Sequence, residues 1–246
     1  MKKNNLKKVL PVILAGGLGT RLRPVIGDFP KVLSPIRNKP FIVYLLKQLA
    51  NVGFNEVFLC VGYKGDLVAD TIGTDFENLN VNYSFEKKPL GTGGALLNLL
   101  PSLNQQTQTL MVLNGDSYID INFGEYVNWH FKNNIKASIV TTMVDNVGRY
   151  GRVLFNDQNA VVGFEEKNDK CKVPGWINAG VYLFPKTLLN QMSHYNSFSL
   201  EHKFLPVLIK NKLYGYKCDN KFIDIGTPNS YEKTDSFFET ILADIF

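Results

Sequence analysis

The sequence has few of the residues that support thiol, imidazole or zinc chemistry. Its 246 residues include three cysteines, Cys60, Cys171 and Cys218, and three histidines. The cysteines form no C-x-x-C pair, and no cysteine–histidine spacing is typical of a zinc site. We therefore predict reduced thiols in a cytoplasmic protein, and a reaction that uses neither a thiol nor an imidazole.

The sequence also lacks a long apolar run. No stretch approaches the roughly 20 apolar residues of a membrane-spanning helix, so no membrane partner is expected. Met1–Lys3 and the apolar run Val9–Ala15 partly resemble a signal peptide, but Pro11 interrupts the run and two arginines follow where small residues would be needed for cleavage. We interpret Val9–Ala15 as a buried first strand.

Composition and charge exclude several classes of protein and several kinds of binding partner. Hydrophobic residues make up 45% of the chain and charged residues 20%, which excludes disordered, collagen-like and disulfide-stapled proteins. The net charge of +5 suits an anionic ligand. No basic helix or mixed basic and aromatic segment is present, so no nucleic-acid partner is expected.

Strand and helix patterns alternate along the chain. Predicted strands are Val9–Ala15, Glu56–Val61, Asn80–Glu86 (with one polar face), Thr109–Leu113, Ala137–Met143, Gly151–Phe155, Ala160–Glu165, Trp176–Phe184 and Tyr214–Ile223. Predicted helices are Pro40–Asn51, Ala95–Leu100, Glu125–Asn133, a helix capped by Ser199 and perturbed by Pro206, and Asn229–Ala243. Without repeats or a low-complexity linker, we expect one α/β domain over residues 1–246, with a sheet that starts parallel and acquires antiparallel strands.

A glycine-rich loop follows the first strand. Glycines at the carboxyl end of a strand let backbone N–H groups approach phosphate oxygens. The loop is neither a Walker A loop, which needs Gly-Lys-Ser/Thr, nor a dinucleotide loop, because Leu22 replaces a small residue and Pro24 obstructs the following helix. Arg21 and Lys31 add positive charge that suits phosphoryl transfer.

These motifs resemble the sugar-1-phosphate nucleotidyltransferases. The similarity runs through nearly the whole chain: Gly16-Gly17-Leu18-Gly19-Thr20-Arg21-Leu22 with Phe29-Pro30-Lys31, Pro89-Leu90-Gly91-Thr92-Gly93-Gly94-Ala95, Leu113-Asn114-Gly115-Asp116, Glu165-Glu166-Lys167, Asn178-Ala179-Gly180-Val181-Tyr182 and Phe222-Ile223-Asp224-Ile225-Gly226-Thr227-Pro228. The resemblance implies a three-layer α/β/α Rossmann-like fold with a mixed, mainly parallel sheet. Its N-terminal half would bind the nucleotide and its C-terminal half the sugar phosphate.

The resemblance also implies roles for individual residues. The catalytic residues would be Arg21, Lys31, Asp116 and Lys167. The nucleotide would contact Leu14, Ala15, Gly16, Gly17, Gly19, Thr20, Arg21, Lys31, Glu86, Gly91, Thr92, Asn114 and Gly115, and the sugar phosphate would contact Tyr150, Gly151, Glu166, Lys167 and Asn178.

Two acidic residues follow predicted strands, and the resemblance makes them metal ligands. Asp116 comes after Thr109–Leu113, and Asp224 follows the last predicted strand. Carboxylates together with substrate phosphates are typical ligands of Mg²⁺, so Mg²⁺ is the expected cofactor. Without the resemblance, an aspartate after a strand is more often a turn or capping residue.

Glu86 is a candidate reader of the nucleotide base. One carboxylate can accept the adjacent N1–H and N2–H of guanine, whereas uracil and thymine offer one N–H between two acceptors. This favours guanine, although a solvent-facing glutamate at the end of a strand remains an alternative.

The implied reaction joins GTP and a sugar 1-phosphate into a GDP-sugar and pyrophosphate. Within the family, Asn114–Ile121, Arg149-Tyr150-Gly151 and Phe164–Lys167 are most similar to D-glycero-α-D-manno-heptose 1-phosphate guanylyltransferases, which supply surface polysaccharides such as lipopolysaccharide or capsule. Mannose-1-phosphate guanylyltransferase, a uridylyltransferase and a catalytically silent regulatory module remain alternatives. Longer members append a left-handed β-helix, which we do not expect here; a homodimer is compatible with the resemblance.

Overall fold

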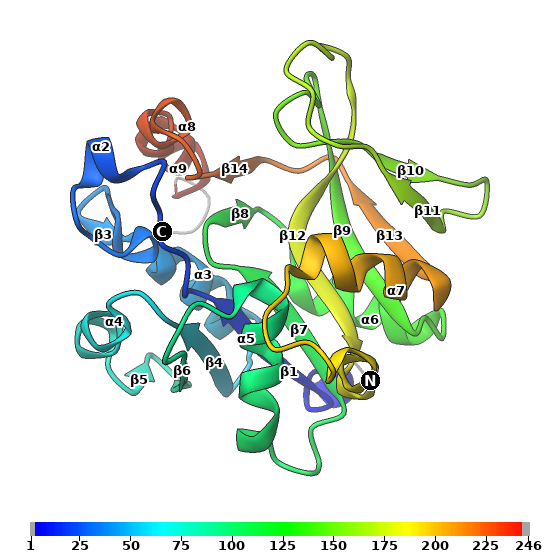
Figure 1. The fold of residues 1–246 in the computed structure, drawn as a ribbon, viewed down its shortest axis with the longest axis horizontal. Coiled ribbons are helices and arrows are strands. Elements are labelled where there is room, and N and C mark those ends of the chain that lie inside the picture. Colours follow the sequence, from blue (N-terminus) through cyan, green and yellow to red (C-terminus); the bar gives the residue numbers. More distant parts are fainter. Residues whose placement is uncertain (1–2, 243–246) are drawn as a thin grey trace.

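An eight-stranded sheet organises the protein. The computed structural model describes residues 3–242, and its sheet has the strand order β13-β9-β12-β7-β1-β4-β6-β5 (Figure 1). The strands are β1 (Val9–Leu14), β4 (Glu56–Val61), β5 (Asp75–Phe76), β6 (Leu79–Phe85), β7 (Thr109–Asn114), β9 (Ala137–Val144), β12 (Gly175–Pro185) and β13 (Leu213–Cys218). β1 pairs in parallel with β4 and β7, and β4 with β6, while β12 runs antiparallel between β7 and β9. The predicted mixed, mainly parallel sheet is confirmed.

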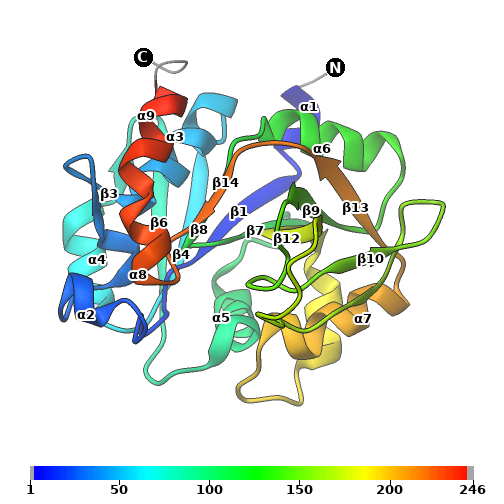
Figure 2. The same ribbon diagram turned by 90° about the horizontal axis from the view of Figure 1, so that it is seen from above.

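Helices cover both faces of the sheet. In Figure 2, α3 (Phe41–Val52), α6 (Phe123–Lys132) and α9 (Thr234–Leu242) lie on one side, with α5 (Gly91–Leu99) and α7 (Leu205–Lys210) on the other. Each face has its own cluster of buried apolar side chains. The predicted three-layer α/β/α arrangement is therefore present.

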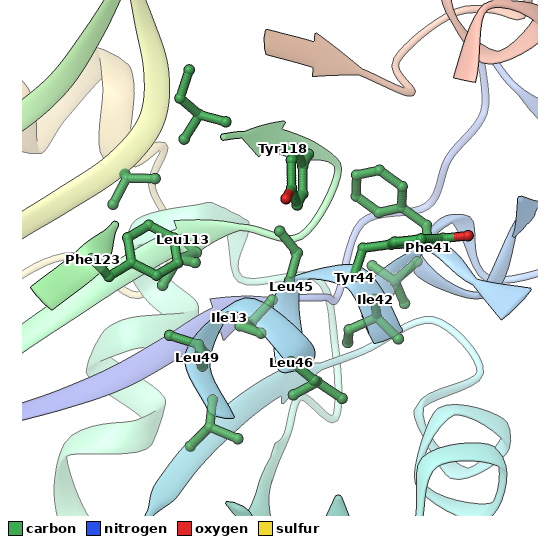
Figure 3. Packing of buried hydrophobic residues seen from close by; sticks show 14 of the residues in the cluster. Ile13, Phe41, Ile42, Tyr44, Leu45, Leu46, Leu49, Leu113, Tyr118 and Phe123 are labelled. Carbon is green, nitrogen blue, oxygen red and sulfur yellow. The ribbon is translucent and has the colours of Figure 1, made fainter. Parts of the chain in front are cut away.

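The packing of α3 shows why one of these helices forms. Its apolar residues recur at helical spacing, so Phe41, Leu45 and Leu49 point into the core and are at most 1% exposed. Figure 3 shows this face packed over Ile13 of β1 and Leu113 of β7. The helix ends at Gly53, whose φ of +94° suits a residue without a Cβ.

The predicted strand Tyr214–Ile223 is wrong as a single element. The chain forms β13, leaves the main sheet, and then forms β14 (Phe222–Asp224), which pairs antiparallel with β8 (Ser117–Ile119). We call β8 and β14 the side ribbon. Three polar residues, Asp219, Asn220 and Lys221, separate the two strands, so Phe222 and Ile223 pair with a different strand from the rest of the predicted element.

Other predictions differ in detail. The predicted helix Ala95–Leu100 begins four residues earlier, as α5 starts at Gly91. The predicted closing helix is divided into α8 (Pro228–Glu232) and α9, and its last residue, Ala243, lies outside the described residues, as do Met1 and Lys2. The polar face predicted for β6 is incomplete, because Ser84 is buried and Phe85 is 47% exposed.

Several short elements were not predicted. They are α1 (Lys3–Leu6), α2 (Arg23–Ile26), α4 (Gly65–Ile72), β2 (Pro35–Ile36), β3 (Lys39–Pro40), β5 and β8, with 3₁₀ turns at Lys31–Leu33, Leu100–Ser102 and Lys186–Met192. The predicted strands Gly151–Phe155 and Ala160–Glu165 are present in shorter form as β10 (Val153–Phe155) and β11 (Val161–Phe164), which pair antiparallel as a separate hairpin. Among the described residues, no helix combines the length and apolar character needed to cross a membrane.

Candidate active site

Two adjoining cavities open at the carboxyl ends of the parallel strands. The first, which we call the loop cavity, has a volume of about 440 Å³, and the second, the hairpin cavity, has a volume of about 800 Å³. Ligands in open α/β sheets bind at this edge. Five residues line both cavities and form their junction: Arg21, Asn114, Asp116, Glu201 and Gly226.

The loop cavity contains every residue that was predicted to contact the nucleotide. Its lining includes Leu14, Ala15, Gly16, Gly17, Gly19, Thr20, Arg21, Lys31, Glu86, Gly91, Thr92, Asn114 and Gly115. Two of the glycines lie close to other groups, Gly115 against backbone and Gly16 against the side chain of Glu86. A Cβ on Gly115 would lie 2.4 Å from the carbonyl oxygen of Leu14, and one on Gly16 would lie 2.6 Å from Oε1 of Glu86.

Glu86 lies in the wall of the loop cavity, immediately after β6. Its Oε2 accepts a hydrogen bond from the backbone N–H of Leu90 at 2.9 Å. Burial raises the pKa of Glu86, and the Leu90 N–H partly offsets this shift. A carboxylate at this place can accept hydrogen bonds from a ligand inside the cavity.

Each predicted metal ligand is paired with a cation. Nζ of Lys31 lies 2.6 Å from Oδ2 of Asp116, and Nη2 of Arg149 donates to both carboxylate oxygens of Asp224 at 2.7 and 2.6 Å. Removal from water raises the pKa of Asp116, but the Lys31 ammonium outweighs it, with help from Ser117 and Arg21, so the pKa lies below its usual value. The Asp116 carboxylate is therefore held ionised at the junction.

The side ribbon brings these two acidic residues together. Asp116 directly precedes β8 and Asp224 ends β14; Asp224 pairs with Ser117, and the N–H of Ile225 donates to the carbonyl of Asp116 at 2.9 Å. Both side chains line the hairpin cavity. Within residues 3–242, no third His, Cys, Asp or Glu joins them in a metal cluster.

The donor set fits Mg²⁺. This ion is commonly held by one or two carboxylates together with substrate phosphates and water. Asp116 keeps 39% of its side chain exposed, so one of its oxygens can reach an ion in the cavity. The side chain of Asp224 is 14% exposed and is occupied by Arg149, which would have to give up one of its two contacts.

Arg21 differs from the other cations of the site. It lines both cavities, yet among the described residues it forms no ion pair or side-chain hydrogen bond. Its guanidinium is available to an anion at the junction, where two phosphate oxygens could be held by its fixed fork of donors.

The hairpin cavity contains all five residues predicted to contact the sugar phosphate. They are Tyr150, Gly151, Glu166, Lys167 and Asn178. Asn178 enters the cavity at a bulge in β12, but its Nδ2 donates to the Tyr182 hydroxyl at 2.8 Å and its Oδ1 accepts from the N–H of Gly180 at 3.0 Å. Much of its polar capacity is thus used within the fold.

Comparison with known proteins shows the family of this chain. A model of the nucleotidyl transferase family matches residues 10–240. The chain belongs to this family. It is 38% identical over 222 residues to a D-glycero-α-D-manno-heptose 1-phosphate guanylyltransferase of Campylobacter jejuni, covering 89% of this chain and 96% of that protein.

Two further relatives have similar coverage. A protein of the same name from Aneurinibacillus thermoaerophilus is 34% identical over 90% of this chain and 95% of its own length. The crystal structure of HddC from Yersinia pseudotuberculosis complexed with GMP-PN is 34% identical, has a TM-score of 0.82 and covers 93% of this chain and 99% of that one.

One family motif also contacts a segment that is distant in the sequence. The Thr92 hydroxyl donates to Glu201 at 3.1 Å and accepts from the N–H of Leu200 at 2.8 Å. A Cβ on Gly91 would lie 2.6 Å from the carbonyl oxygen of Phe198. Gly91 and Thr92 line the loop cavity, but their main contacts within the described chain hold the segment Phe198–Glu201 in place.

Sequence reasoning missed two side chains of this nucleotidyl transferase. Arg149 was noted only as part of a motif, and Glu201 was not selected at all. The Ser199 cap was predicted and its hydroxyl accepts the N–H of His202, so a glutamate two residues later was a detectable signal. Its place at the junction, however, depends on contacts with α5 that are distant in sequence.

Proposed function

We propose that this nucleotidyl transferase makes a GDP-sugar and pyrophosphate from GTP and D-glycero-α-D-manno-heptose 1-phosphate. One observation carries the reaction: the loop cavity and the hairpin cavity meet at a wall that holds Arg21 and Asp116. Such a wall suits transfer between two anionic substrates. The choice of substrates is supported by two relatives, 38% and 34% identical over most of the chain, that carry this heptose guanylyltransferase name.

The two halves of the chain divide the substrates between them. Residues 14–116 supply most of the loop cavity, and residues 149–229 supply most of the hairpin cavity. We assign the nucleotide to the former and the sugar phosphate to the latter, within one domain. The glycine loop would direct backbone N–H groups to the triphosphate, and Lys167 would bind the phosphate of the sugar.

The reaction is an in-line substitution at the α-phosphorus of GTP. An oxygen of the sugar phosphate attacks, the α–β phosphoanhydride bond breaks, and pyrophosphate leaves with the electron pair. The attacking oxygen is already ionised near neutral pH, so no general base is needed. Catalysis then consists of orientation by Lys167 and charge neutralisation by Arg21 and Lys31.

Asp116 and Asp224 would hold Mg²⁺, which supplies positive charge to the reacting phosphates when it is bound. Lys31 and Arg149 balance these carboxylates within the protein. These contacts hold both carboxylates in place, Asp116 at the junction and Asp224 in the hairpin cavity.

Glu86 would select the base. Its carboxylate lies in the loop cavity and can accept the paired N–H donors of guanine. Its contact with the Leu90 N–H fixes the carboxylate orientation. Uracil and thymine have a carbonyl oxygen on each side of their N–H, and such an oxygen would be repelled by the lone pairs of this carboxylate.

We further propose that the enzyme works in the cytoplasm as part of surface polysaccharide synthesis, in which a glycosyltransfer reaction consumes the nucleotide sugar. A homodimer remains a prediction. Size-exclusion chromatography with light scattering tests the dimer, and fractionation of the native cell tests the location.

A pyrophosphate-release screen tests the proposed function. Purified protein with Mg²⁺ is given GTP, ATP, UTP, CTP or dTTP, each with heptose, mannose, glucose or galactose 1-phosphate. We expect the highest kcat/KM with GTP and the heptose. A preference for mannose 1-phosphate would change the assigned sugar, and a preference for UTP would refute the assigned base. No pyrophosphate release in any combination would refute the proposed activity.

A further inference from the structure

Glu201 occupies the junction of the two cavities without a cationic partner. It is the second residue of the π-helical turn Leu200–Phe204 and lines both cavities. Its Oε2 accepts hydrogen bonds from the hydroxyls of Thr92 at 3.1 Å and Ser199 at 2.9 Å. Among the described residues these are its only hydrogen bonds and it has no ion pair, so Oε1 remains available to a ligand.

The fold holds this carboxylate at a fixed place. The backbone N–H groups of Gly93 and Gly94 donate to the carbonyl of Phe198 at 3.0 and 3.3 Å. A Cβ on Gly93 would lie 2.0 Å from the Phe198 ring, so only glycine allows this contact. π-Helical turns are rare and frequently occur at functional sites. The start of α5 therefore acts as a support that orients Glu201.

The surroundings of Glu201 indicate which ligand groups it can meet. Asp116 and Asp224 each have a cation, and the described acids form no cluster of three that would make Glu201 a metal ligand. A carboxylate facing a phosphate would be repelled. Oε1 of Glu201 is an acceptor without a partner among the described residues, so it suits a hydrogen-bond donor on the ligand.

We propose that Glu201 is a specificity-determining residue whose Oε1 accepts a hydrogen bond from a hydroxyl group on a sugar ring. The inference rests on the proposed function, in which both substrates carry such a ring beside the reacting phosphates. The ribose of GTP presents 2′- and 3′-hydroxyls, and the acceptor presents a hydroxyl at C2. The recognised chemistry is the same for both sources, and analogues that lack one hydroxyl distinguish them.

The test compares how much the removal of one substrate hydroxyl lowers kcat/KM in the parent and in Glu201 variants. Glu201→Gln keeps the size of the side chain and removes its charge, and Glu56→Gln makes the same change on the exposed start of β4. Steady-state kcat and KM are measured for each with GTP, 2′-deoxy-GTP and 3′-deoxy-GTP, and with heptose 1-phosphate and its 2-deoxy counterpart.

We expect the parent and Glu56→Gln to discriminate against one analogue by about 10–100-fold in kcat/KM, as for a hydrogen bond to a charged group. In Glu201→Gln this discrimination should shrink at least about tenfold. If the discrimination against a deoxy-GTP is lost, the contact is with the ribose. If the discrimination against the 2-deoxy sugar phosphate is lost, the contact is with the acceptor. Glu201→Asp keeps the negative charge but moves the carboxylate away from the ligand, so it should lose the same discrimination. This variant replaces Glu201→Gln in the test if the glutamine variant does not fold.

The contrary outcomes are distinct. Discrimination that is unchanged in both Glu201 variants overturns this inference alone, and so does an equal loss of activity with every analogue. A parent that turns over no nucleotide with any sugar 1-phosphate overturns the proposed function and this inference with it.

Discussion

The loop cavity and the hairpin cavity are built in different ways. The loop cavity is made largely from strand ends and the turns that follow them, and its shape depends on backbone approaches such as that of Gly115 to Leu14. The hairpin cavity collects side chains from a bulge, a hairpin, the side ribbon and a π-helical turn. A local motif can specify the first kind of site, whereas the second exists only when distant segments meet.

The largest expected effect comes from Asp116 at the junction and Asp224 beside it, because both substrates are expected to depend on these two acids. We expect Asp116→Asn and Asp224→Asn each to lower kcat by at least about 10²-fold, through loss of charge stabilisation in the transition state. Pyrophosphate release measures the rate, and circular dichroism checks the fold. Asp157→Asn, in an exposed turn, is the matched control. Near-normal turnover in both variants would remove the metal assignment.

A cation of the hairpin cavity should affect one substrate and spare the other. We expect Lys167→Ala to lower kcat/KM for the sugar phosphate about 10–100-fold, because a charged hydrogen bond is lost, while the dissociation constant of GTP is unchanged. Titration with a fluorescent GTP analogue measures the latter. Lys170→Ala changes an exposed lysine of the same loop and should match the parent. Equal weakening of GTP binding by Lys167→Ala would contradict the division between cavities.

The converse variant lies in the loop cavity. Glu86→Gln should reduce the preference for GTP over UTP about tenfold and leave KM for the sugar phosphate unchanged. Glu77→Gln, on an exposed turn before β6, provides the control. If Glu86→Gln and the parent rank the nucleotides identically, Glu86 does not read the base.

The same glutamate affects stability in a predictable direction. Burial raises the pKa of Glu86 above its ordinary value, so the neutral form is favoured in the folded protein. The stabilisation that the neutral Glu86 side chain gives to the folded protein is present below the pKa of this group in the unfolded chain. It is lost as the pH rises through the pKa of Glu86 in the folded protein. Glu86→Gln should therefore unfold at a slightly higher temperature than the parent at neutral pH, which calorimetry measures; a lower temperature would contradict the stated cause.

The smallest catalytic effect is expected outside both cavities. His130 of α6 is 2% exposed, its Nδ1 lies 2.8 Å from the Ser138 hydroxyl, and burial lowers its pKa from 6.5 to about 4. A base with a depressed folded pKa loses stability as the pH falls, here between about 6.5 and 4. The loss is about 2–3 kcal/mol over that window.

Chemical denaturation at pH 7 and pH 4.5 checks this sign. The parent should lose more stability between the two pH values than His130→Gln does, whereas kcat at pH 7 should be similar for both. Equal pH dependence in the two proteins would show that His130 does not titrate on unfolding.

The accuracy of the sequence predictions follows the same division. The boundaries of β4 were predicted to the residue because a buried parallel strand is a continuous apolar run. The single strand Tyr214–Ile223 was wrong because residue pattern does not reveal which partner a strand will pair with. The division of this segment matters for the site: Asp224 lies beside Asp116 only because β14 leaves the main sheet for β8.

Roles were harder to predict than positions. All the predicted nucleotide and sugar-phosphate residues line the two cavities, yet the Thr92 hydroxyl and the Asn178 amide are largely engaged by the protein itself. A motif identifies residue types near a ligand, but hydrogen-bond partners from distant segments determine which atoms remain for it.

The sequence alone determined the alternation of strands and helices, the glycine loop and the acid that follows β7. These features depend on periodicity and on backbone freedom, which act between neighbouring residues. Only the tertiary structure decided that Lys31 pairs with Asp116, that Arg149 holds Asp224, and that Glu201 reaches the junction without a cation. Those outcomes join residues 75 to 109 positions apart, and such contacts form only when the folded chain brings charge and hydrogen-bonding groups into one place.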